Sequence, residues 1–65
     1  MWMVVYVAEQ KSVADHIEKI LSDEGILVKV RCANKDIEGS NCLYEILVPQ
    51  SEINESYDVL MEHEY

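Results

Sequence analysis

The sequence has 65 residues, of which 49% are hydrophobic, with two glycines and one proline. This composition excludes a disordered chain and favours one domain over residues 1–65, near the lower size limit for folding without disulfides, metals or partners. Thirteen acidic residues against five basic ones give a net charge of −8. Nucleic acid is therefore excluded as a partner, because phosphate neutralisation needs clustered lysines and arginines.

The first predicted element is a strand over residues 2–8, WMVVYVA, which is rich in β-branched and aromatic side chains. This apolar start is too short to span a bilayer and has no basic region before it, so we expect neither a membrane anchor nor a signal peptide. From this we predict a cytoplasmic location, where the reducing environment keeps cysteines as thiols.

A helix is predicted next, with Ser12 as its N-cap and Gly25 at the position that ends it. The residues that form its apolar face share helical spacing; they are Val13, Ile17, Ile20 and Leu21.

Two further strands are predicted over residues 26–32 and 42–48, and the stretch between them is rich in turn-forming residues. Pro49 ends the last strand, and Ser51 is predicted to cap a second helix. The apolar positions of this second helix are Ile53, Tyr57, Leu60 and Met61.

The predicted element order is therefore β-α-β-β-α, an α+β fold. A right-handed crossover between the first two strands places the third strand between them, so the sheet order is 2-3-1 and both helices cover one face. The expected architecture is a ferredoxin-like split βαβ unit that lacks its last strand.

The two cysteines are the candidate residues for redox chemistry or metal binding. Pairing Cys32 with Cys42 is the predicted register of the second and third strands, and it sets Lys29 opposite Glu45 as a favourable ion pair. Three interpretations stay open: small buried thiols, which we favour, a disulfide between opposite residues, and a metal site, for which the sequence has no CxxC motif.

Catalytic motifs are absent from the sequence, which has no Gly-rich phosphate loop, HExxH or GxSxG. His16 lies beside the apolar face of the first helix, where a structural role is more common than a catalytic one. We therefore expect no enzymatic activity, no metal and no cofactor.

Self-association is predicted from the first strand, whose outer edge is unpaired and whose sequence carries no charge or proline. The face of the sheet without helices is a second apolar surface. It carries three leucines and those alternate residues of the first strand that point away from the helices, either Trp2-Val4-Tyr6 or Met3-Val5-Val7. We expect a homodimer or small homo-oligomer through the edge or the face. The candidate interface residues are Trp2, Val4, Tyr6, Leu27, Leu43 and Leu47.

Four segments, Val4–Ala8, Ala14–Leu21, Glu24–Ile26 and Val48-Pro49, resemble the DUF2007-type family of signal transducing proteins. The resemblance covers nearly the whole chain. It implies a small cytoplasmic, oligomeric domain that is related in fold to the GlnB-like PII proteins and has no established enzymatic activity. It also implies that the turn before the third strand is a signalling loop, with Asn34, Lys35, Asp36, Glu38 and Gly39 as candidate residues.

Three functions follow as hypotheses. The leading one is a non-enzymatic regulatory or protein-interaction module. The alternative is a thiol-based redox or metal-responsive protein that uses Cys32 and Cys42, and the third is a small-ligand sensor with its ligand between the signalling loop and a neighbouring subunit.

Overall fold

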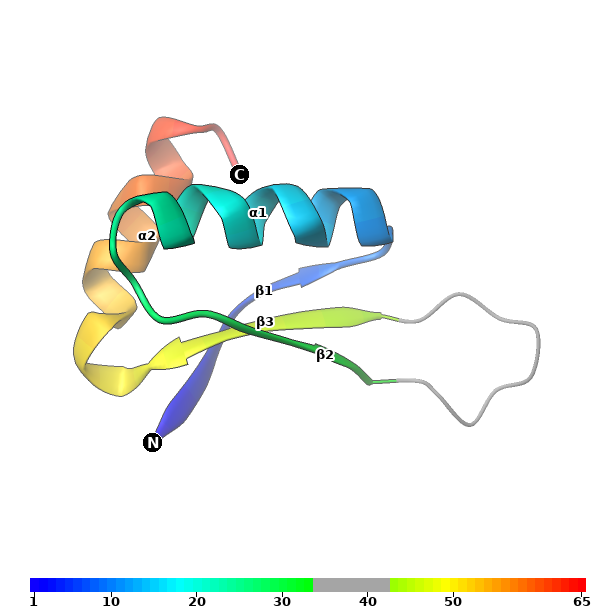
Figure 1. Cartoon of the computed structure of the whole chain (residues 1–65), viewed down its shortest axis with the longest axis horizontal. Coiled ribbons are helices and arrows are strands. Elements are labelled where there is room, and N and C mark those ends of the chain that lie inside the picture. Colours follow the sequence, from blue (N-terminus) through cyan, green and yellow to red (C-terminus); the bar gives the residue numbers. More distant parts are fainter. Residues whose placement is uncertain (34–42) are drawn as a thin grey trace.

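The structure is a computed structural model that describes residues 1–33 and 43–65. Its elements in chain order are strand β1 (Trp2–Ala8), helix α1 (Lys11–Asp23), strand β2 (Lys29–Cys32), strand β3 (Tyr44–Pro49), a 3₁₀ turn (Gln50–Glu52) and helix α2 (Ile53–Glu62). The sheet is antiparallel in the order β1-β3-β2, and both helices lie on one side of it (Figure 1). The predicted α+β fold, with the third strand central, is confirmed.

The hydrophobic core lies between the sheet and the two helices. Its centre is formed by fully buried side chains from one strand and one helix, among them Ile46 and Val48 of β3 and Ile17 and Leu21 of α1. No helix within the described residues is long and apolar enough to cross a bilayer.

The register of β2 against β3 differs from the predicted one by two residues. Cys32 lies opposite Tyr44, and Arg31, not Lys29, lies opposite Glu45. A two-residue shift leaves every side chain on the same face of the sheet, so the hydrophobic pattern cannot distinguish the two registers. The predicted strand register, in which Cys42 is the cross-strand neighbour of Cys32, is therefore wrong, because Tyr44 holds that position.

Strand β1 contains a β-bulge that breaks the expected alternation of its side chains. Val4 pairs with Leu47 and Tyr6 pairs with Ile46, so Val5 is the extra residue. Val5 and Tyr6 consequently both pack on the helix side, in or against the core. Neither predicted alternate set is correct, because the side chains on the helix-free side are Trp2, Val4 and Val7.

Helix α1 begins one residue before the predicted cap and ends as predicted. Its N-cap is Gln10, which makes no side-chain capping hydrogen bond, so Ser12 is not the cap. At the other end Gly25 has φ +83°, and the amides of Gly25 and Ile26 donate to the carbonyls of Ser22 and Leu21. This pattern is a Schellman motif, and it confirms the role predicted for Gly25.

Helix α2 buries a different face from the predicted one. Ser51 lies in the 3₁₀ turn before the helix and does not cap it. Tyr57 is 45% exposed and Met61 is 71% exposed, so the apolar stripe predicted through them is wrong. The side chains that α2 turns to the core are Ile53, Ser56, Val59 and Leu60.

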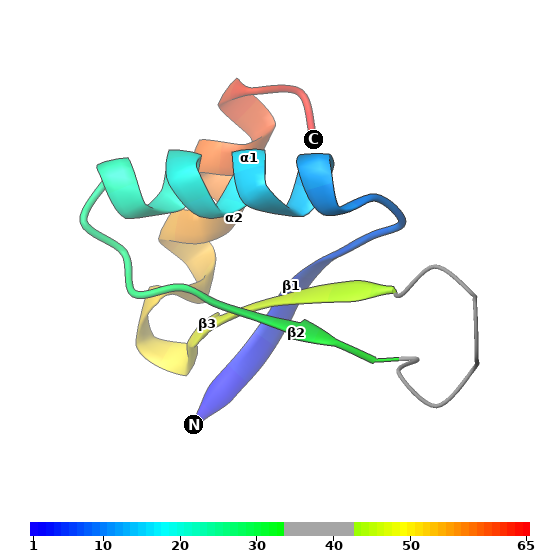
Figure 2. The same ribbon diagram turned by 45° about the vertical axis from the view of Figure 1, so that its right-hand side comes forward.

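The tail after α2 turns back beside α1 (Figure 2). The ring of Tyr65 packs edge-on against Tyr6 of β1, with ring centroids 5.7 Å apart. The Tyr65 hydroxyl lies 2.5 Å from Nδ1 of His16. These contacts cover Tyr6 on the helix side of the sheet.

Candidate functional site

The side of the sheet that the helices do not cover carries a group of exposed apolar side chains. We call this surface the sheet face. It consists of alternate residues of the three strands and their extensions, namely Trp2, Val4, Val7, Leu27, Lys29, Arg31, Leu43, Glu45 and Leu47. The apolar members other than Leu47 range from 38% exposed at Leu43 to 65% exposed at Leu27.

Leu47 lies at the centre of the sheet face and is only 5% exposed. Its partners on the neighbouring strands are Val4 and Lys29. The ammonium nitrogen of Lys29 lies 5.2 Å from the centre of the Trp2 ring, a cation–π contact. Because Trp2 and Lys29 stand on the two outer strands, this contact passes over β3 and covers Leu47.

One ion pair lies on the sheet face. Nε and Nη2 of Arg31 donate to the same carboxylate oxygen of Glu45, at 2.8 and 2.5 Å. The predicted ion pair of Lys29 with Glu45 is wrong, since Lys29 lies opposite Leu47. The carboxylate of Glu45 is thus satisfied within the chain.

The structure places four of the six predicted interface residues in the exposed part of the sheet face: Trp2, Val4, Leu27 and Leu43. Leu47 belongs to the face but is buried within it. Tyr6 does not belong to the sheet face, because the bulge turns it to the helix side, where Tyr65 covers it. Val7, which belongs to the other predicted alternate set, lies on the sheet face for the same reason and is 48% exposed.

The candidate signalling-loop residues Asn34, Lys35, Asp36, Glu38 and Gly39 lie outside the described residues, as does the ligand position predicted beside them.

Cys32 is not the free thiol that the sequence favoured. Cys32 is half-buried at the end of β2 and is disulfide-bonded, so the prediction of a free buried thiol is wrong for this residue. Cys42, the only other cysteine of the sequence, lies outside the described residues. A sulfur held in a disulfide is not a thiolate, and Cys32 is therefore not a nucleophile in this state.

Both histidines make structural contacts. His16 contacts Tyr65, and Nδ1 of His63 lies 3.0 Å from the Val59 carbonyl oxygen one turn earlier in α2. Among the residues that the structure describes, no group of three or more metal-binding side chains is close enough to hold an ion.

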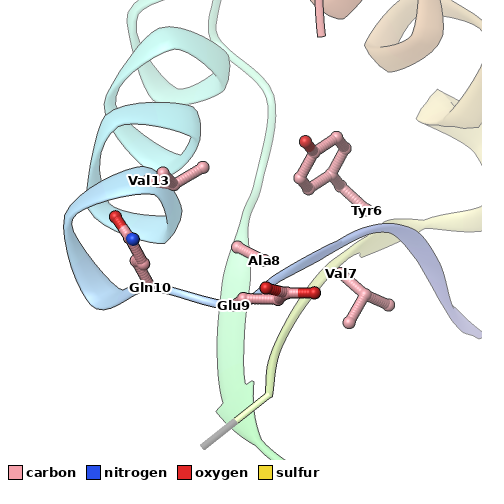
Figure 3. A pocket seen from close by; sticks show the side chains of 6 residues that line it. All are labelled: Tyr6, Val7, Ala8, Glu9, Gln10 and Val13. Atoms are coloured by element: carbon pink, nitrogen blue, oxygen red, sulfur yellow. The ribbon is translucent and has the colours of Figure 1, made fainter. Parts of the chain in front are cut away.

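A shallow hollow of about 370 Å³ opens where β1 leads into α1. Figure 3 shows Tyr6 and Val13 on its two sides, with Ala8 between them and Glu9 and Gln10 at its margin. None of the six lining residues is a lysine, arginine, histidine or cysteine. The hollow thus offers no cation for a phosphate or carboxylate ligand.

Charge is divided sharply between the two layers of the molecule. The strands and their flanks (residues 1–8, 29–33 and 43–49) carry Lys29, Arg31 and Glu45, a net side-chain charge of +1. The helix layer (residues 9–28 and 50–65) carries ten carboxylates and two lysines, a net charge of −8. Both of those lysines are already paired, Lys11 with Asp15 at 3.0 Å and Lys19 with Asp23 at 3.4 Å.

The pKa of Lys11 is raised above its ordinary value, first by its hydrogen bond to Asp15 and then by the charge of the same carboxylate. A raised pKa keeps this lysine protonated at neutral pH, as it would be without the shift. The shift therefore does not mark a catalytic site.

Comparison with protein-family models, with curated proteins and with solved structures finds no match to this sequence. The resemblance to the DUF2007-type family therefore stays a prediction.

Proposed function

We propose that the protein is a non-enzymatic interaction module that binds a protein partner through the sheet face. The observation that carries the proposal is the row of exposed side chains on β1, Trp2, Val4 and Val7, which flanks the covered Leu47. A contiguous exposed apolar patch on a soluble domain commonly marks a binding surface. Tryptophan and arginine, both present on the sheet face, are enriched among the residues that dominate interface energies.

No catalytic role is assigned in this proposal. The imidazoles of His16 and His63 are used in contacts that hold the tail and the end of α2. The exposed carboxylates follow the solvated faces of the two helices, where they aid solubility.

Site-specific photo-crosslinking in cells tests the proposal. Benzoylphenylalanine replaces Val7 on the sheet face in one variant and Met61 on α2 in the matched control; both positions are exposed, at 48% and 71%. We expect a defined protein adduct from position 7 and none from position 61. The absence of any adduct from position 7 would contradict the proposal.

The disulfide at Cys32 favours a second candidate function, a redox-responsive protein. In the reducing cytoplasm predicted from the sequence, such a bond would form only under oxidation and could therefore report it. A disulfide typically contributes about 2–4 kcal/mol of stability.

The redox candidate is tested by titrating the protein with glutathione at a series of redox ratios while recording free thiols and the melting temperature. A transition within the cytosolic range of potentials, lost in Cys32→Ser, would support a redox function. A bond that no glutathione ratio in that range breaks would identify a purely structural disulfide.

A further inference from the structure

We infer that the partner of the sheet face is a second copy of this chain, in a two-fold dimer whose β1 and β3 residues face one another. This inference rests on the proposed function and names its partner. Most soluble homo-oligomers are closed and symmetric, and in a two-fold dimer each copy contributes the same patch.

The charge distribution decides which surface two copies can share. The helix layer has a net side-chain charge of −8, whereas the strands and their flanks have +1. Contact between two helix layers would bring like charges within a Debye length, about 8 Å at physiological salt. Contact between two sheet faces instead keeps the acidic layers on opposite outer sides of the dimer.

The same distribution argues against other partners for this face. A strongly basic protein would be attracted to the helix layer and not to the sheet face. A strongly acidic one would be repelled by the molecule as a whole, and on the face it would meet Arg31, which is already paired with Glu45, and Lys29, which has no ion-pair partner among the described residues. An apolar, nearly neutral surface is the best complement, and a second sheet face is such a surface.

The layout of the face fits a dimer with a dry centre and a polar rim. Trp2, Val4 and Val7 belong to β1, and Leu47 lies beside them on β3. Arg31 stands on β2, the opposite edge strand, and is already paired with Glu45. The ammonium group of Lys29 lies over the Trp2 ring in the single chain and has to swing back toward its own edge strand when two faces meet. Glu45 is already paired with Arg31, so closing the interface leaves no carboxylate of the face unpaired.

The bulge in β1 favours the face over the edge as the site of association. A bulge bends and twists its strand, and native sheets use bulged edges to discourage edge-to-edge pairing. The register shift between Val4 and Tyr6 puts the bulge near the middle of β1. A regular ladder between two copies of β1 would therefore be interrupted there.

The chain carries its own reporter for this association, since its only tryptophan, Trp2, belongs to the sheet face and is 43% exposed. We expect the Trp2 emission maximum to move to shorter wavelength as the protein concentration rises from about 1 µM to about 100 µM, because association removes the ring from water. Sedimentation equilibrium on the same samples should show a monomer–dimer equilibrium.

Val7→Lys is the variant that tests the surface, with Met61→Lys as the matched control in the helix layer. Position 7 lies opposite Glu45, so the new lysine gains a cross-strand carboxylate and the monomer should still fold. In the dimer the same lysine would be desolvated, and we expect the dissociation constant to rise at least about tenfold. Met61→Lys should leave the dissociation constant unchanged. Trp2→Ala is a second variant of the sheet face, and its association is measured by sedimentation.

Two results would overturn the inference: a folded monomer at every concentration, or a dimer that Val7→Lys does not weaken. The mass of the crosslinked adduct from position 7 separates this failure from that of the proposed function. If position 7 crosslinks to a different protein while this chain sediments as a monomer, a second copy is ruled out as the partner but the proposed interaction module is retained. A monomer without any adduct would remove both.

Discussion

At the scale of single residues, Glu64 stands in a backbone conformation that suits glycine. Its φ is +64°, and it closes α2 through amide hydrogen bonds from Glu64 and Tyr65 to the carbonyls of Met61 and Leu60. This is the same motif that Gly25 completes after α1. A side chain in the left-handed region costs on the order of 1 kcal/mol, which glycine avoids.

Glu64→Gly is therefore expected to raise the free energy of unfolding by about 0.5–1 kcal/mol, measured by urea denaturation. The control is Glu62→Gly, which removes the same charge from the last turn of the helix. There glycine loses helix propensity and should lower the free energy of unfolding by about 1 kcal/mol. Equal losses in the two variants would show that the conformation of Glu64 carries no strain.

Single residues also show what local sequence signals can and cannot predict. Gly25 could be assigned because a left-handed position after a helix favours one residue type strongly. Ser12 and Ser51 were assigned wrongly because serine suits several positions near a helix start, and here the chain enters its helices through Gln10 and through the 3₁₀ turn. Neither helix start has a side-chain capping hydrogen bond, so a serine in the sequence could not mark either start.

At the scale of elements, α2 packs on a face that its apolar residues alone do not indicate. Ser56 is fully buried, and its hydroxyl donates to the Glu52 carbonyl at 2.8 Å, which satisfies the only polar atom of the side chain. Tyr57 is larger and more apolar but is half-exposed. The small side chain decides the orientation of the helix because a bulky one would not fit against the core.

Ser56→Leu is expected to lower the free energy of unfolding by about 1–3 kcal/mol through overpacking. The matched control, Tyr57→Leu, changes an exposed position of the same helix and should stay within about 0.5 kcal/mol of the parent. Thermal denaturation followed by circular dichroism measures both. If Tyr57→Leu were the more damaging change, the helix would bury the face first predicted from its sequence.

The register of β2 and β3 is the element-scale feature that sequence could not specify. The two candidate registers differ by two residues, bury the same side chains and each provide Glu45 with a basic partner. Periodicity and charge pairing therefore do not distinguish the two registers. The bulge at Val5 is also invisible to an alternation rule, because it places two successive apolar residues on one side.

A double-mutant cycle distinguishes the two registers experimentally. We expect a coupling of about 0.5–1 kcal/mol between Arg31→Ala and Glu45→Ala, a modest value because Arg31 is 59% exposed. The cycle of Lys29→Ala with Glu45→Ala serves as the control and should show coupling near zero. The reverse pattern would restore the register in which Lys29 faces Glu45.

At the scale of the whole molecule, topology could be predicted because few arrangements satisfy the element order. Parallel β1 and β2 need a right-handed crossover, and α1 is that crossover, so β3 fills the space between them. The open face of the sheet followed from the same reasoning, since both helices predicted from the sequence cover the other face. Its residue list was incomplete because the bulge exchanges Tyr6 for Val7.

The uneven charge of the molecule has a consequence for its stability. A net charge of −8 lies in the helix layer, where both lysines are already paired with carboxylates. The remaining carboxylates repel one another in the folded state more than in the expanded unfolded chain. Salt screens this repulsion. Added salt should therefore stabilise the folded protein and should also favour association between copies.

We therefore expect the melting temperature at low protein concentration to rise by several degrees when NaCl increases from about 20 mM to about 500 mM. Replacing two exposed carboxylates of α2, by Glu55→Gln with Asp58→Asn, should raise the low-salt melting temperature and reduce the gain from salt, because less repulsion remains to be screened. Glu45→Gln is the control for charge removal as such, since it takes away the partner of Arg31 and should lower the melting temperature. Equal responses of these variants to salt would contradict the charge division between the layers, because the effect would then depend on net charge and not on where the carboxylates lie.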